Sequence, residues 1–352
     1  MTTNDKPPVI PYATPSLGDW LLSKRTLFAI LEVVFRVLAL AAVFAVFWVL
    51  VGNSFVSAGN IENICRQSAV YAMGGIGMTF IMLTGGIDLA AGSTIALSMV
   101  VTAMTLDAGA ANQPMLFIPL AVGAGVAVAT LVGVVQGLLI TQLRIVPFII
   151  TLGGLVSIRG LTKRIADNQE ISPDAANWLY KRLMFPVQGI EFNYQLVPYG
   201  VWATLIAAIG AALFLRYTRF GRRIYAVGSN EATARLCGVP VLRTKTLVYA
   251  IGGAFFGLAG VLEFSKLNMG QPTGAMMYEL YIIAACVIGG TSLRGGVGTI
   301  FGTVIGALLI GVLNSGAQQA GWEKQDQEIA IGLIIITAVA LNQIRTRRDA
   351  TA

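Results

Sequence analysis

The sequence predicts an all-α membrane protein, a polytopic bundle of about ten transmembrane helices. Of its 352 residues, 56% are hydrophobic and only 12% are charged, whereas charged residues make up about a quarter of an ordinary soluble domain. A soluble globule of this size could not bury so much apolar surface, so the excess must face lipid. The chain also has no His. The usual neutral-pH general base and the commonest metal ligand are therefore missing, which disfavours an enzyme.

About ten apolar runs with few or no charged residues approach the length of roughly 20 apolar residues that a membrane crossing needs. Two of them, 145–161 and 280–293, are short, and Pro147 near the start of the first lacks a backbone donor. For both, a broken or re-entrant helix that lines a cavity is the alternative to a full crossing. The predicted spans are 27–51, 68–86, 89–106, 115–141, 145–161, 196–215, 246–262, 280–293, 298–315 and 328–344.

One loop sets the orientation of the chain. Residues 216–245 carry seven Lys and Arg against one acid, Glu231, which places this loop in the cytoplasm by the positive-inside rule. Counting spans outward from it puts both termini on the same side. The net charge of +7 is therefore topological, and nucleic acid is not needed to explain it. The predicted organisation is a cytoplasmic arm (1–26), a transmembrane domain (27–344) with an outer loop (162–195) and the basic cytoplasmic loop (216–245), and a cytoplasmic tail (345–352).

Glycines spaced four residues apart predict close helix packing. Gly298, Gly302 and Gly306 form one such series, and the pairs at 253/257 and 133/137 repeat the spacing on other spans. Small residues at this interval let helix backbones approach one another in a membrane. The spacing indicates a tightly packed bundle and says little about function.

Two glycine-rich turns, 84–93 and 288–297, follow apolar runs. Each has a Gly-Gly pair, then Leu, then another Gly at the same offset, which is either a small internal repeat or chance in a chain with 40 glycines. Asp88 lies in the first turn, where an acid is costly in lipid unless it faces water, a partner charge or helix amides. A cap for the next helix and a gating or substrate-contacting role are the two readings of Asp88.

Polar residues around 264–278 form a further group, which the predicted topology places on the outer face. They could hydrogen-bond a hydroxyl-rich solute or dock a delivery protein, and a simple solvated hairpin is the alternative. The long outer loop is likewise either a connector or a surface that touches a partner. The outer-face candidates are Glu263, Asn268, Gln271 and Glu279.

A short isolated helix is predicted within the basic loop. Ser229 or Asn230 is a suitable N-cap, Glu231 suits the first turn, and Gly238 ends the helix ahead of Pro240. A helix of about two turns is marginal alone in water, so it needs a docking surface. The chain contains no Gly-Lys dipeptide and hence no Walker A phosphate loop of the usual form. ATP, if used, must be bound elsewhere.

These stretches together resemble a known family. The segments 228–238, 247–263, 271–273, 278–280 and 288–296, with 85–93 and 147–161 before them, closely resemble the permease subunits of ribose-type ABC sugar importers. The resemblance runs from about residue 63 to the C-terminus. The segment that begins at Glu231 looks like the coupling-helix sequence of this class, with Thr233 where a second Ala is frequent.

The resemblance implies a division of labour between chains. It implies a pair of permeases, a separate ATPase subunit that binds ATP and Mg, and a soluble sugar-binding protein, with no cofactor in this chain. It does not fix the sugar. The coupling residues that it implies are Ser229, Asn230, Glu231, Ala232, Thr233, Ala234, Arg235 and Gly238, and the pathway or gate residues are Gly85, Gly86, Asp88, Gly92, Ser93, Gly289, Gly290, Thr291 and Ser292. The rival hypothesis is an ion-coupled secondary transporter that uses Asp88, Glu263 or Glu279 as proton carriers.

Overall fold

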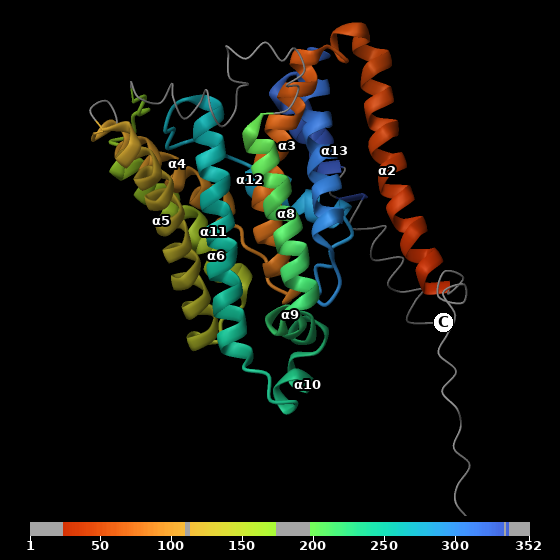
Figure 1. The fold of residues 1–352 in the computed structure, drawn as a ribbon, viewed down its shortest axis with the longest axis vertical. Coiled ribbons are helices and arrows are strands. Elements are labelled where there is room, and N and C mark those ends of the chain that lie inside the picture. Colours follow the sequence, from red (N-terminus) through yellow and green to blue (C-terminus); the bar gives the residue numbers. More distant parts are fainter. Residues whose placement is uncertain (1–23, 110–112, 174–197, 334–335, 338–352) are drawn as a thin grey trace, which may run out of the picture.

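The computed structural model describes residues 24–109, 113–173, 198–333 and 336–337, and the regular elements of these residues are helices. Long helices lie side by side in a bundle, and α9 and α10 project beyond one end of it (Figure 1). We call this end the α10 end. The helices are α2 (Lys24–Val51), η1 (Gly52–Ser54), α3 (Ala58–Leu83), α4 (Ala91–Asp107), α5 (Pro114–Leu143), α6 (Pro147–Ile165), α8 (Tyr199–Tyr217), α9 (Arg219–Ser229), α10 (Glu231–Leu236), α11 (Val241–Leu267), α12 (Tyr278–Ile288) and α13 (Ile300–Gln319), and a further helical stretch covers 324–333.

The predicted fold class, a helical membrane bundle, is confirmed. Among the described residues, five helices are long and apolar enough to cross a membrane, and α4 and α12 are shorter apolar helices. The count of about ten crossings stays a prediction. The arm before residue 24 and the tail 345–352 lie outside the described residues. The five segments are Val33–Ser54, Met115–Leu143, Tyr199–Tyr217, Val241–Leu267 and Ile300–Gln319.

The two short predicted spans behave differently. Residues 147–161 belong to one continuous helix, α6, and Pro147 is its first residue, a position at which the missing N–H costs nothing. The run 280–293 is broken, because α12 ends at Ile288 after 11 residues. At 1.5 Å per residue such a helix is about 16 Å long, roughly half of the hydrocarbon core.

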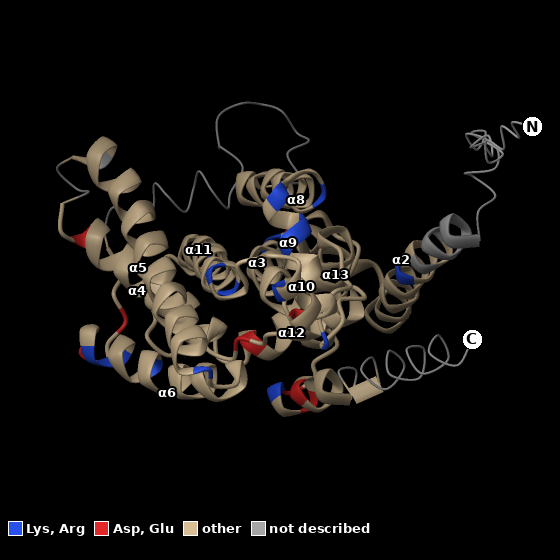
Figure 2. Ribbon diagram, turned by 90° about the horizontal axis from the view of Figure 1, so that it is seen from below, with Lys and Arg blue, Asp and Glu red and all other residues tan. Residues whose placement is uncertain are grey.

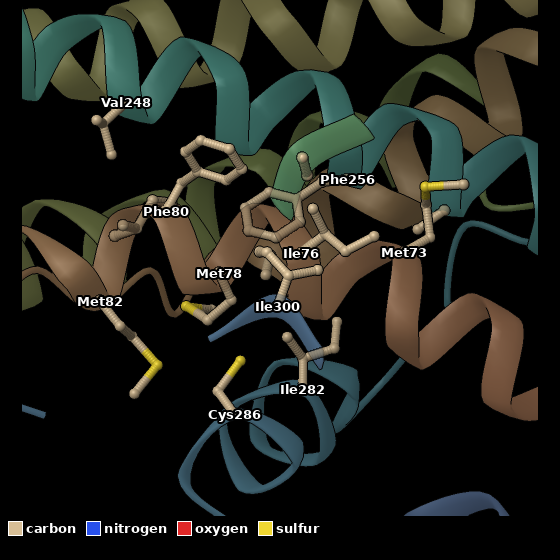
Figure 3. Packing of buried hydrophobic residues seen from close by; sticks show 14 of the residues in the cluster. Met73, Ile76, Met78, Phe80, Met82, Val248, Phe256, Ile282, Cys286 and Ile300 are labelled. Carbon is tan, nitrogen blue, oxygen red and sulfur yellow. The ribbon is translucent and has the colours of Figure 1, made fainter. Parts of the chain in front are cut away.

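Helix α3 forms the centre of the bundle. Every residue from Ser68 to Leu83 is buried, and its side chains pack against α11 on one side and α12 on the other (Figure 3). A buried cluster of this kind fixes the register of α3 against its neighbours. Its members include Met73, Ile76, Met78, Phe80 and Met82 of α3, Val248 and Phe256 of α11, and Ile282 and Cys286 of α12.

The predicted glycine seams are confirmed for α5 and α11. A Cβ added at Gly133 would overlap the Tyr249 carbonyl, and one at Gly253 would overlap the Ala129 carbonyl. In the same way Gly302 and Gly306 bring α13 against the end of α12. Gly298 differs from the prediction, because it precedes α13 and lies instead against Thr291.

Candidate coupling and pathway site

The predicted short helix is present as α10, with caps at both ends. The Asn230 side chain accepts a hydrogen bond from the Thr233 amide at 2.9 Å, which selects Asn230 over Ser229 as the N-cap. Gly238 adopts φ +77° just beyond the helix. A second helix, α9, precedes α10 and was not predicted. Thr218 caps it by accepting from the Gly221 amide at 3.0 Å.

Helix α10 is held against the bundle by an apolar contact with α9 and α11 and by an ion pair with α11. Ala234 is buried against Val227 of α9 and Val241 of α11. Glu231 accepts hydrogen bonds from Lys245 at 2.6 Å and from Arg235 at 3.2 Å. The Lys245 hydrogen bond is the main reason that the pKa of Glu231 lies below its ordinary value. Glu231 therefore stays ionised at neutral pH and holds α10 against the start of α11.

The opposite face of α10 is open. Leu236 is 89% exposed, and Ala232, Thr233 and Arg235 are exposed as well. Seen from the α10 end, Lys and Arg gather on α8, α9 and α11 around α10 (Figure 2). This face of α10 therefore presents one large apolar side chain within a basic surround.

The two glycine-rich turns close α3 and α12 with the same hydrogen-bond pattern. At the end of α3, Gly85 N–H donates to Met82 and Gly86 N–H to Ile81, at 2.9 and 3.2 Å. At the end of α12, Gly290 N–H donates to Val287 and Thr291 N–H to Cys286, both at 2.9 Å. Gly85 and Gly290 have φ of +77° and +86°, which only Gly adopts without strain. In the structure Gly85 thus corresponds to Gly290. The sequence match instead pairs Gly85 with Gly289, one residue earlier.

The structure brings both turns into contact with the end of α9. The Gly296 amide donates to the Leu83 carbonyl at 3.0 Å, and a Cβ at Gly228 would overlap that same carbonyl. A Cβ at Gly295 would lie 2.8 Å from the Gly85 amide and 3.0 Å from the Gly228 carbonyl. We call these residues, Leu83, Gly85, Gly228, Gly295 and Gly296, the glycine junction. It joins three segments backbone to backbone.

A side-chain contact strengthens the link between α9 and the second turn. Tyr225 of α9 donates a hydrogen bond to the Gly298 carbonyl, just before α13, at 3.0 Å. Asn230, the N-cap of α10, follows Gly228 by two residues. Any rigid movement of α10 and α9 would therefore act directly on the end of α3 and on the loop between α12 and α13.

The Asp88 side chain hydrogen-bonds the backbone close to it in the sequence. Its carboxylate accepts from the Ala90 amide at 2.8 Å and is 2% exposed. This is an Asx turn just before α4. The N-cap of α4 is Ala90, and no side chain caps this helix, so the expectation that Asp88 is the cap is not confirmed. Nearby, Ser93 donates to the Leu155 carbonyl at 2.8 Å, which ties α4 to α6.

The other pathway candidates lie within the same two turns. Gly92 packs under the Glu279 carboxylate, and Gly289 packs against the backbone of Gly302. Ser292 N–H donates to the Val297 carbonyl at 2.8 Å. The Thr291 hydroxyl is buried and has no hydrogen-bond partner among the described residues.

Glu263 differs from the outer-face expectation. It is 2% exposed and pairs with Lys266 at 3.1 Å, while the Tyr278 hydroxyl donates to it at 2.9 Å. The Tyr278 ring lies edge-on to Tyr71, 5.1 Å away, and Asn314 donates to the Tyr71 hydroxyl at 3.1 Å. These five residues, the tyrosine cluster, link α3, α11, α12 and α13 near the end of α11. The sequence predicts a solvated position for Glu263. Its burial could not be seen there, because its partner Tyr278 lies on the far side of the loop between α11 and α12.

Two of the remaining outer-face candidates, Asn268 and Gln271, contact the first part of the outer loop. Gln271 donates to Glu170 at 2.7 Å, and Ile171 pairs with Gly270 in an isolated antiparallel bridge. Asn268 ends α11 with φ +61°, and Glu279 follows in the first turn of α12. The described part of the outer loop therefore packs on the chain's own 268–274 loop.

Sequence reasoning gave Arg159 no structural role. Its guanidinium donates to the carbonyls of Pro272 and Gly274 at 3.1 and 2.6 Å and so fixes the loop between α11 and α12. A charge within an apolar span is the signal that could have identified it. No group of three or more His, Cys, Asp and Glu in the described part of the chain could hold a metal ion.

Comparisons with known proteins agree with this architecture. Residues 60–339 match the family described as branched-chain amino acid transport system / permease component. The ribose import permease protein of Escherichia coli (strain K12) is 36% identical over 92% of this chain and 94% of its own length.

Two further relatives have similar coverage. The ribose import permease protein of Bacillus subtilis (strain 168) is 38% identical over 82% of this chain and 86% of its own. The D-allose transport system permease protein of Escherichia coli (strain K12) is 36% identical over 87% and 90%. No solved structure matches the chain significantly. The chain belongs to the branched-chain amino acid transport system / permease component family.

Proposed function

We propose that the chain is the membrane-spanning permease subunit of an ABC importer for a monosaccharide. The observation that carries this proposal is α10, a capped helix that projects from the bundle, exposes Leu236 and is joined through α9 to the ends of two bundle helices. Its relatives are permeases for ribose and allose, which supports a pentose or hexose as the solute.

A separate ATPase subunit supplies the energy. In this proposal its ATP-driven closure moves α10, and the glycine junction passes the movement to the end of α3 and to the loop between α12 and α13. Because those contacts are made by backbone atoms, little displacement is absorbed by flexible side chains. The turns at Gly85 and Gly290 then rock with the helices that they end, and access to the pathway alternates between the two sides.

The other partners follow from the same division of labour. A second permease, identical or homologous, completes the pathway, and a soluble sugar-binding protein delivers the solute at the end opposite α10. ATP and Mg are bound by the ATPase and not by this chain. The protein lies in the bacterial inner membrane, with α10 and both termini in the cytoplasm.

The competing proposal, an ion-coupled transporter, finds less support. It needs acids that are free to exchange protons. Glu263 is paired with Lys266 and Tyr278, and Asp88 accepts from the Ala90 amide. Of the three candidate acids this leaves Glu279, whose Oε2 atom has no hydrogen-bond partner among the described residues. Uptake should persist after a protonophore is added and stop when the ATPase is lost.

The direct experiment is uptake of labelled ribose, allose and galactose by cells that carry the chain with its ATPase and binding protein. Glu231→Ala removes the pair with Lys245 and should lower uptake and ATPase stimulation by up to about fivefold, the effect of one exposed ion pair. Membrane insertion should be unchanged. The matched control is Glu323→Ala, an exposed acid away from α10. Wild-type uptake by the Glu231 variant would contradict the assignment.

A further inference from the structure

A cavity of about 470 Å³ lies where α8 ends and α9 and α13 begin. Its wall is apolar on one side and basic on the other, and this size suits a small polar group. Neither α10 nor the glycine junction contributes to it. The lining residues are Ala212, Leu215, Arg216, Arg222, Tyr225, Thr299, Ile300 and Phe301.

The cavity has an excess of positive charge. Arg216 and Arg222 line it and no acidic residue does. Neither guanidinium forms an ion pair with a carboxylate in the described part of the chain. Arg216 lies over the Tyr217 ring at 5.5 Å, a contact that leaves its N–H donors available. Two uncompensated guanidinium groups at one cavity favour a phosphate, which they can bind in bidentate geometry.

The position of the cavity identifies the source of that phosphate. Both α8 and α13 are long and apolar enough to cross the membrane, and the cavity lies at the last residues of one and the first of the other. It is therefore at the level of the lipid headgroups, where Tyr217, 66% exposed, is typical of a membrane interface.

The apolar side of the cavity continues onto the surface of the bundle. Phe301 lines the cavity and is 58% exposed, and Leu213 on α8 is 50% exposed. A free phosphate ion would leave this apolar surface uncovered, whereas the acyl chains of a lipid would cover it. We propose that this cavity binds the headgroup of an anionic phospholipid, with its phosphate at Arg216 and Arg222 and its chains along α8 and α13.

The test uses the purified full-length chain and native mass spectrometry with added phosphatidylglycerol or phosphatidylcholine. Arg216→Gln/Arg222→Gln should weaken phosphatidylglycerol binding on the order of tenfold or more, because each basic residue near the surface contributes substantially. The matched control is Arg219→Gln/Arg223→Gln, which removes the same charge from the same segment outside the cavity. It should weaken binding clearly less than the cavity variant, because it removes only the general attraction of surface charge for an anionic headgroup and no direct contact with the phosphate. Phosphatidylcholine has the same phosphate, but its choline group offsets the charge, so it should bind the wild type more weakly and lose less than phosphatidylglycerol in the cavity variant.

Two further arms separate the lipid from other occupants. Phe301→Ser keeps the charges and should also weaken phosphatidylglycerol binding, and its helical circular dichroism reports whether the variant folds. Inorganic phosphate at millimolar concentration should not displace the lipid. Equal losses in the cavity and control variants would overturn the proposal, as would displacement by phosphate or unchanged binding in the Phe301 variant.

Discussion

The two ends of the bundle are held together by different chemistry. At the α10 end, the glycine junction joins three segments through backbone atoms. Near the end of α11, the tyrosine cluster joins four helices through side-chain hydrogen bonds and one buried ion pair. A backbone contact cannot repack without moving a helix, whereas a side chain can change rotamer. In the proposed transport cycle we therefore expect the α10 end to transmit movement rigidly and the opposite end to open and close.

The largest expected effect comes from breaking the buried pair at the tyrosine cluster. Lys266→Ala leaves the carboxylate of Glu263 buried without its counter-ion, which should lower the free energy of unfolding by about 3 kcal/mol. Thermal unfolding in detergent measures this change. Lys324→Ala, at an exposed position, is the control and should stay within about 0.5 kcal/mol of wild type.

A second variant shows whether the unpaired charge of Glu263 causes the loss of stability. Lys266→Ala/Glu263→Gln removes both charges and should recover part of the lost stability. If Lys266→Ala unfolds like its control, the ion pair does not hold that end of the bundle together.

The next effect tests the glycine junction. Gly228→Ala places a methyl group on the Leu83 carbonyl and should lower the free energy of unfolding by about 1–3 kcal/mol, the usual cost of overpacking. Uptake should fall by more than the loss of folded protein accounts for, because the contact also carries movement. Gly210→Ala in α8, where a Cβ would meet nothing within 4 Å, should leave uptake unchanged. Normal uptake by correctly folded Gly228→Ala would remove the junction from the mechanism.

The smallest expected effect concerns the ion pair between Glu231 and Lys245, which holds α10 against α11. The pKa of Glu231 is lowered by Lys245, so the pair stabilises the fold above the ordinary Glu pKa of about 4.3 and loses its effect as pH falls through the lower, folded value. The stability difference between wild type and Lys245→Met should be below about 1 kcal/mol. It should stay constant from neutral pH to about pH 5 and shrink in stronger acid. A stability difference between the two proteins that grows as the pH falls would contradict this account of the Glu231–Lys245 pair.

The local features of the chain could be predicted from its sequence. Uncharged runs located the helices, and the caps of α10 followed from Asn230 and Gly238, because hydropathy and capping depend on neighbouring residues. Helix α9 was missed because its basic residues, including Arg222 and Arg223, resemble those of a solvated loop. In the structure one side of α9 is buried through Ile224 and Val227.

Contacts between distant segments could not be predicted in this way. The match between the two glycine turns was visible, but their meeting at Gly228 depends on how α3, α9 and α12 pack. The same holds for Glu263, whose burial depends on Tyr278 and Lys266 closing over it. Sequence patterns locate the apolar part of a helix better than its ends, since α3 begins at Ala58, ten residues before its predicted span, and they leave tertiary partners open.

The central claim, that α10 is the docking helix for an ATPase, can be tested with a native thiol. Cys237 directly follows α10 and is exposed, whereas Cys65 is half-buried and Cys286 is buried. In membranes that hold the assembled complex, maleimide labelling of Cys237 should slow about tenfold when the ATPase is present at ten times its Kd, and labelling of Cys65 should not change. Leu236→Ser should restore the labelling of Cys237. An unchanged Cys237 rate in a complex known to be assembled would contradict the claim.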